Sequence, residues 1–182
     1  MSLGDLRAAR DDYSTALGLA TSSGSEVYAL AAWGLGVAYA RDDDLPDALK
    51  YAWTASQMLF PVWNDAAKRT VPTMAIDLPS VFYTPDHEIF YYRALAEMAA
   101  AEHTDDPRKR GDRLLRAVAF WDEYIAAVRK SGDRWIRNAE FQLKWCARRL
   151  AETGVKRPSA APGSKGGSGS RSRRPPPTRA PD

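Results

Sequence analysis

Cysteine is almost absent from this chain, since Cys146 is the only one among 182 residues. A single cysteine excludes an internal disulfide and any metal cage built from several thiolates, and it suits a reducing compartment. The sequence also lacks an apolar run of eighteen residues, and its start, Met1 to Asp12, mixes charges without the apolar core of a secretory signal. We therefore expect a cytoplasmic protein with no membrane span and no cleaved signal.

Little in the sequence suggests catalysis. No phosphate-cradling glycine loop, nucleophile elbow or paired metal-ligand motif is present. The two histidines, His87 and His103, lie near opposite ends of one expected helix, and Glu88 beside His87 would point about 100° away from it. Cys146 lies on an apolar stripe without a nearby histidine, which predicts a buried, inert thiol. We expect no cofactor, no metal and no enzymatic activity.

Excess positive charge is confined to the C-terminal end. Gly154 to Asp182 holds seven Lys or Arg and one Asp, whereas Met1 to Thr153 holds nineteen basic and twenty-two acidic residues. A mildly acidic body lacks the basic stripe of a protein that follows phosphates, so a nucleic-acid or membrane-surface role could reside only in the tail. The Pro, Gly, Ser and Arg content of residues 154–182 predicts a disordered tail. Three roles are open for such a tail: it keeps the protein soluble, it binds another protein as a polyproline ligand around Pro175 to Pro177, or it anchors the chain to acidic surfaces.

Helical periodicity runs through most of residues 1–153 and predicts one all-α domain of six helices. Ser23 and Glu26 form a capping box for the second helix. We interpret the acidic run from Asp42 to Asp44, which precedes Pro46, as the cap of the third helix rather than as a metal site. The third helix should stop at Phe60-Pro61, the fourth should start at Thr84-Pro85-Asp86, and Gly154 should cap the end of the last. The expected helices span residues 3–20, 26–41, 44–60, 84–102, 107–130 and 134–152.

The pattern lapses between Val62 and Tyr83. This segment contains Pro72, Pro79 and an apolar stretch from Met74 to Leu78. Such a composition predicts an ordered extended cover or a functional loop rather than a flexible linker.

Three of the expected helices share a spacing of small and large residues. Gly4-Asp5-Leu6, Ala9, Tyr13 and Ala16 recur as Asp43, Leu45, Ala48, Ala52 and Ala55, and again as Asp112, Leu114, Ala117, Trp121 and Tyr124. A second, complementary pattern lies on the second and fourth expected helices. It consists of Leu35-Gly36 with Tyr39, and of Leu95-Ala96 with Ala99.

This pattern resembles the tetratricopeptide repeat family, in which small residues let paired helices approach closely. The sequence departs from that pattern at Ala32, where tryptophan is usual, and at Phe60-Pro61, where the closing proline is one position late. The resemblance implies stacked antiparallel helical hairpins with a terminal capping helix. It also implies a scaffold that binds a peptide or partner helix on its concave surface.

If the chain follows the pattern of this family, the residues on its concave surface form an apolar groove with one basic and one acidic residue. They are Trp33, Val37 and Ala40 in the second helix, and Phe90, Arg93, Glu97 and Ala100 in the fourth. Trp33 and Phe90 could instead pack in the core against the 62–83 insertion, and Arg93 and Glu97 could be a solvated i,i+4 pair.

The last helix suggests a second docking surface. Its apolar stripe is expected to face the stack and consists of Ile136, Ala139, Leu143, Cys146, Ala147 and Leu150. Phe141 and Trp145 should point to the opposite side, flanked by Arg134 and Arg148, where a partner or a second copy would cover them. Contact with the insertion or tail, and plain exposure, are the alternatives.

Together these features favour a protein-interaction module. Two alternatives stay open: a nucleic-acid-associated protein that uses its basic tail, and a small-ligand sensor or enzyme with a pocket beneath the 62–83 insertion.

Overall fold

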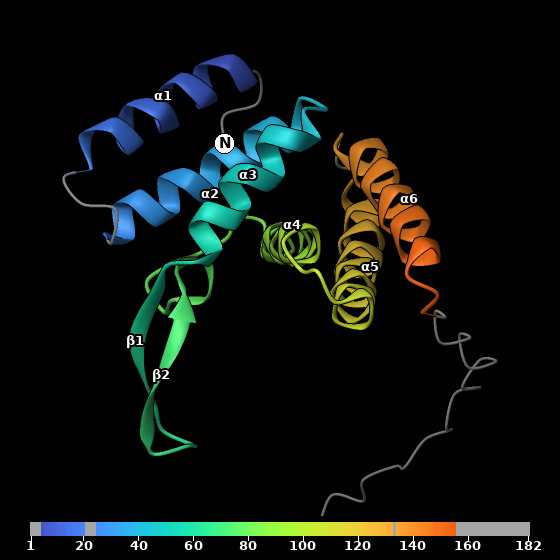
Figure 1. Ribbon diagram of the computed structural model, residues 1–182. Helices are drawn as coiled ribbons and strands as arrows, with labels where there is room; N and C mark the ends of the chain where they lie inside the picture. Colours follow the sequence, from blue (N-terminus) through green and yellow to red (C-terminus); the bar gives the residue numbers. More distant parts are fainter. Residues whose placement is uncertain (1–4, 21–24, 133, 156–182) are drawn as a thin grey trace, which may run out of the picture.

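A computed structural model describes residues 5–20, 25–132 and 134–155, and these are mostly helical (Figure 1). The described residues form six helices, one 3-10 turn and one two-stranded hairpin. The elements are α1 (Leu6–Leu19), α2 (Glu26–Arg41), α3 (Leu45–Ser56), β1 (Leu59–Asn64), β2 (Arg69–Met74), η1 (Ala75–Asp77), α4 (Glu88–Glu102), α5 (Pro107–Ser131) and α6 (Ile136–Glu152).

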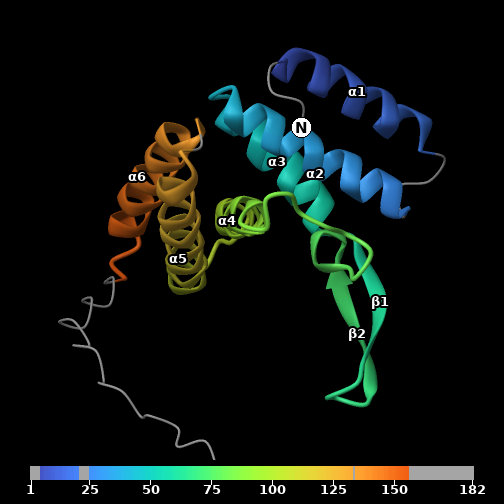
Figure 2. The same ribbon diagram turned by 180° about the vertical axis from the view of Figure 1, so that it is seen from behind.

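Each helix packs chiefly on the helices that precede and follow it in the sequence. Figures 1 and 2 show α1, α2 and α3 on one side of α4, with α5 and α6 on the other side, so α1 and α6 lie at opposite ends. The β hairpin projects away from the helices next to α3.

Short polar side chains and glycines set most helix ends, as the sequence predicts. Asp44 accepts a hydrogen bond from the backbone N–H of Asp47 and thereby caps α3, which confirms the capping role of the acidic run. Gly132 and Gly154 have positive φ angles of 73° and 72°, so both take the left-handed conformation that ends a helix after α5 and α6. The cap of α2 is Ser25. The predicted Ser23 lies outside the described residues.

Two predicted boundaries are wrong. Helix α3 ends at Ser56, and the apolar Leu59-Phe60 pair begins strand β1 rather than closing the helix. Helix α4 begins at Glu88, and Thr84 does not cap it, because its N-cap position is occupied by His87 without a side-chain hydrogen bond.

The β hairpin corrects the prediction of an all-α fold. Strands β1 and β2 are antiparallel, and Pro61 lies directly opposite Pro72 in the register. Phe60 and Val62 are half-buried on the face that they share with Val71 and Thr73, whereas Leu59 and Trp63 on the opposite face are exposed. The segment predicted to be an ordered cover is therefore an extended arm followed by η1.

Small residues bring the first helices into close contact. A Cβ atom on Gly36 would lie 3.2 Å from the carbonyl oxygen of Ala48 and 3.3 Å from the backbone nitrogen of Ala52, so α2 and α3 touch there through backbone. A Cβ atom on Gly34 would meet the ring of Tyr13 at 2.5 Å, so α1 rests on α2 at that point.

Large aromatic side chains fill the centre of the stack. Tyr91, Trp121 and Tyr124 are fully buried, and their rings meet edge to face with centroids 4.8 to 6.2 Å apart. Edge-to-face pairs add to the free energy gained by burial, so this cluster stabilises the contact between α4 and α5.

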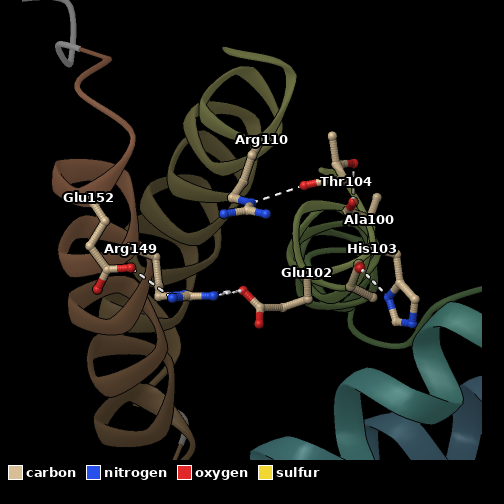
Figure 3. A network of polar contacts seen from close by, with 8 residues as sticks. Ala100, Glu102, His103, Thr104, Arg110, Arg149 and Glu152 are labelled. Carbon is tan, nitrogen blue, oxygen red and sulfur yellow. Dashed lines mark hydrogen bonds and ion pairs between the residues drawn. The ribbon is translucent and has the colours of Figure 1, made fainter. Parts of the chain in front are cut away.

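A network of polar contacts joins the C-terminal ends of α4 and α6 (Figure 3). Arg149 donates to Glu102 at 2.6 Å and to Glu152 at 2.7 Å, and Arg110 donates to the carbonyl oxygen of Thr104 at 3.0 Å. These contacts hold α6 on the same pair of helices that the aromatic cluster joins.

Replacing Gly36 with leucine should destabilise the fold. The added side chain would push α2 away from the backbone of α3, and such overpacking typically costs about 1–3 kcal/mol. Urea unfolding followed by circular dichroism measures the change. Gly18→Ala is the matched control, because a Cβ atom there meets nothing within 4 Å, and its free energy of unfolding should stay equal or rise. Equal losses in both variants would contradict the close approach.

Candidate functional site

A cavity of about 680 Å³ lies between α1, α2 and the start of α4. The irregular segment 81–85 and the turn between α5 and α6 complete its walls. Its volume lies within the range of cavities that bind small molecules or the anchoring side chain of a peptide.

Aromatic rings line much of this cavity. Trp33 of α2 is fully buried, and its ring centroid lies 6.2 Å from that of Tyr92 on α4. Tyr83 meets Tyr92 edge to face at 5.3 Å and donates its hydroxyl to the carbonyl oxygen of Ile76 at 2.9 Å. Tyr13 of α1 closes the wall above Gly34. The cavity therefore suits an apolar or aromatic group.

A buried ion pair lies at one end of the cavity. Arg41, at the end of α2, donates to Glu88 at 2.5 Å, and the Arg41 side chain is 4% exposed. The guanidinium lies 5.0 Å from the ring centres of both Tyr91 and Trp135. Burial lowers the pKa of Arg41, but the charge of Glu88 and the two nearby tyrosines outweigh this, so the pKa is raised. The guanidinium of Arg41 therefore keeps its charge beside Glu88.

Asn138 of α6 extends this ion pair into a network. Its Nδ2 donates to the carbonyl oxygen of Ala40 at 2.6 Å and to Asp43 at 2.9 Å, while its Oδ1 accepts from the hydroxyl of Tyr91. The carbonyl of Ala40 is among the last four of α2, which have no partner within the helix. Asn138 therefore supplies a C-terminal cap to α2 from the far end of the stack.

The cavity also contains hydrogen-bond donors. Within the described part of the chain, the indole N–H of Trp33 has no hydrogen-bond partner. Burial raises the pKa of Tyr13 and of Tyr92, so both phenols keep their protons throughout the physiological range. The indole of Trp33 can only donate a hydrogen bond, and the phenols of Tyr13 and Tyr92 can donate one each.

Of the predicted groove residues, Trp33 alone lines this cavity. Val37 is fully buried in the core. Phe90 is half-buried and packs against the same core. Core packing, the alternative considered for Trp33 and Phe90, therefore describes the surroundings of both. The groove drawn from the repeat pattern is not one continuous surface.

Arg93 and Glu97 do not form the i,i+4 pair that was the alternative. Arg93 donates to Asp77 of η1 at 2.7 Å and lies 5.9 Å from the ring centre of Phe120. Glu97 instead accepts from Arg113 at 3.1 Å and from Arg116 at 3.0 Å, both on α5. These two residues join α4 to different neighbours.

The predicted patch on α6 is also divided. Phe141 is 49% exposed and Arg148 is exposed, but Trp145 is half-buried against the core, with the guanidinium of Arg149 at 5.7 Å from its ring centre. Arg134 lies 4.3 Å from the ring centre of Trp135 and lines the cavity. Ala147, expected to face the stack, is exposed. Phe141 remains as an isolated exposed aromatic.

Several cavity residues were not predicted from the sequence: Tyr13, Arg41, Tyr83, Glu88, Tyr92 and Trp135. Arg41 and Glu88 are 47 positions apart and belong to no repeat position, so their pairing has no sequence signal. Gly34 lies inside a helix next to Trp33. A glycine at such a position is a sequence signal that another helix packs closely against this place.

Among the described residues, no group of three or more His, Cys, Asp or Glu side chains is placed to hold a metal ion. None of the described helices combines the length and the apolar character needed to cross a membrane. The predictions for the basic tail concern residues 156–182, which lie outside the described part.

No family model, curated protein or solved structure matches this chain. The comparison with the tetratricopeptide repeat therefore rests on the repeated residues and on the packing described above.

Removing the charge of Arg41 should strongly destabilise the protein. Arg41→Met leaves Glu88 buried without its partner, and breaking a buried pair typically costs about 3–5 kcal/mol. Denaturant unfolding measures this change, and the double variant Arg41→Met, Glu88→Leu should recover part of it. Arg129→Met breaks an exposed pair with Glu140 and is the control, with an expected cost below about 1 kcal/mol. A small loss for Arg41→Met would refute the structural role of the pair.

Cys146 should be unreactive in the folded protein. The thiol is fully buried, and burial raises its pKa to about 12, so the thiolate is scarce near neutral pH. Ellman's reagent at pH 8 should detect no free thiol in the native protein and one after unfolding in guanidinium. Rapid reaction of the native protein would show that α6 is not held as described.

Proposed function

We propose that this chain is a non-catalytic protein-interaction module that docks a segment of a partner protein in the cavity between α1, α2 and α4. The cavity carries this proposal, because aromatic side chains line it and its volume of about 680 Å³ suits the anchoring side chain of a peptide.

The packing of the helices supports a short stack of tetratricopeptide-like hairpins. Helices α2 and α3 form one pair and α4 and α5 the next, with α1 before them and α6 after them. Gly36, Ala48 and Ala52, which are three positions of the repeated pattern, meet at the close contact of the first pair. In the family that this pattern resembles, the first helix of each pair lines the binding surface, and α2 and α4 both contribute to the cavity.

Phe141 supports a second, weaker candidate surface. It is exposed on the last helix of the stack, and a second copy of the chain could cover it. One cross-linking experiment can test the cavity and this surface together.

A photo-reactive phenylalanine analogue placed at residue 82 should cross-link the partner. Phe82 is 87% exposed and lines the cavity, so a docked segment must pass close to it. The analogue at residue 141 is the matched control, because Phe141 is also exposed but lies on α6. Cross-linked products, made in a lysate of cells that express the full chain, are identified by mass spectrometry.

A partner that cross-links from residue 82 and not from residue 141, and is lost when Ala9→Trp fills the cavity, would support the proposal. Ala9→Trp must retain its helical circular dichroism for this comparison. Cross-links from residue 141 alone would overturn the cavity as the docking site. A product of twice the chain mass from that position would identify a second copy as the partner of α6.

A further inference from the structure

We infer that the outward face of α6 binds single-stranded nucleic acid, with Phe141 as the ring on which a base stacks and three neighbouring cations that hold the phosphates. This function is separate from the docking proposed for the cavity, and neither depends on the other.

Four residues of α6 share one narrow face of the helix. Successive residues of an α-helix are about 100° apart, so spacings of four, three and four place them within roughly 60° of arc. All four are exposed, and α6 lies at one end of the stack, so this face is turned away from the other helices (Figures 1 and 2). We call this face the α6 stripe, and it consists of Arg137, Phe141, Lys144 and Arg148.

The positive charge of the α6 stripe is uncompensated within the described residues, where its three cations form no ion pair. The two acidic side chains that flank the stripe have other partners. Glu140 accepts from Arg129 of α5 at 3.1 Å. Glu152 accepts from Arg149 at 2.7 Å. Net charge averages over all faces of a protein, so the acidic total of residues 1–153 conceals a locally basic face.

The exposed ring favours a single strand over a duplex. Phe141 is 49% exposed and lies between cations on the same face. The stripe from Arg137 to Arg148 is roughly 16 Å long, at a rise of about 1.5 Å per residue, so one short strand can reach all of it. Proteins that bind single strands combine a basic track for the backbone with aromatic rings on which bases stack. The bases of a duplex already stack on one another, so a duplex would leave the ring without a partner.

A membrane surface is a poorer match for the same face. An amphipathic helix binds a bilayer by burying its apolar side in it. The apolar residues of α6 instead pack inside the stack, and Phe141 is the large apolar side chain of this helix that is left exposed. One ring supplies little of the apolar area that such binding needs.

The C-terminal end of the chain adds charge next to the α6 stripe. Residues 154–182 follow α6 in the sequence and hold seven Lys or Arg and one Asp. Affinity for phosphates rises with the number of cations that contact them. We therefore assign the base contact to the stripe, and additional affinity without base preference to the tail.

The test measures fluorescence anisotropy of labelled oligothymidine and oligouridine of about 20 nucleotides, enough for one site, with the full chain. Both should bind. Phe141→Ala should weaken both by at least about fivefold, as expected for loss of one stacked base. It should not weaken binding of an abasic oligonucleotide or of a duplex, because neither offers a free base to the ring. Trp63→Ala removes an exposed ring on the hairpin and is the matched control, with no expected change.

The charges are tested by the salt dependence of the same binding. Glutamine at all three cations of the α6 stripe should lower the slope of log affinity against log salt by about two, since each phosphate contact with a single strand contributes about 0.7. The control removes the same charge from α1, β2 and α5 at three exposed residues that form no ion pair among the described residues, and it should keep the slope. It combines Arg7→Gln, Arg69→Gln and Lys109→Gln. Circular dichroism checks that every variant remains helical.

A second readout does not depend on these variants. A photo-reactive phenylalanine analogue at residue 141 of the purified chain should cross-link oligothymidine, and the analogue at residue 63 should not. No cross-link from residue 141, no effect of Phe141→Ala, or equal losses in the two charge variants would overturn the inference. Binding to vesicles that contain phosphatidylserine without binding to either oligonucleotide would overturn it in favour of a membrane. None of these results bears on the cavity, which the protein cross-links from residue 82 test separately.

Discussion

The ion pair between Arg41 and Glu88 is the contact on which the arrangement of the helices depends. It joins the end of α2 to the beginning of α4, while Tyr124 brings α5 to the same point and Trp135 and Asn138 bring α6. Two charges removed from water need close partners, so any shift of the first pair relative to the second that separated them would be unfavourable. The cavity borders the junction, and its shape is fixed by the same geometry.

Much of the helical fold could be predicted from the sequence, because local chemistry marks where a helix must stop. Asp44, Gly132 and Gly154 end or begin helices for reasons that act within a few residues of each. The hairpin could not be predicted in this way. Leu59, Phe60, Val62 and Trp63 are all apolar, so the alternation typical of a strand is hidden, and Pro61 looks like the end of a helix.

The candidate site was less predictable, since it depends on contacts between distant residues. Trp33 lines the cavity as well as the core, whereas Val37 and Phe90, which the repeat pattern places beside it, belong to the core alone. On α6 the predicted apolar stripe faces the stack except at Ala147, which is exposed, and the buried face also includes Asn138 and Gln142. Asn138 is buried within a hydrogen-bond network of distant residues, and such a residue has no periodic signature in the sequence.

The pairing of Pro61 with Pro72 has a consequence for how molecules of this protein meet one another. Opposite residues in an antiparallel pair either exchange both hydrogen bonds or exchange none, and prolines can only take the second position. There the backbone N–H would point outward, so both free edges of the arm lack a donor at the same level. A strand from another molecule would find its ladder interrupted halfway along either edge. The protruding arm can therefore carry exposed apolar side chains without seeding a shared sheet.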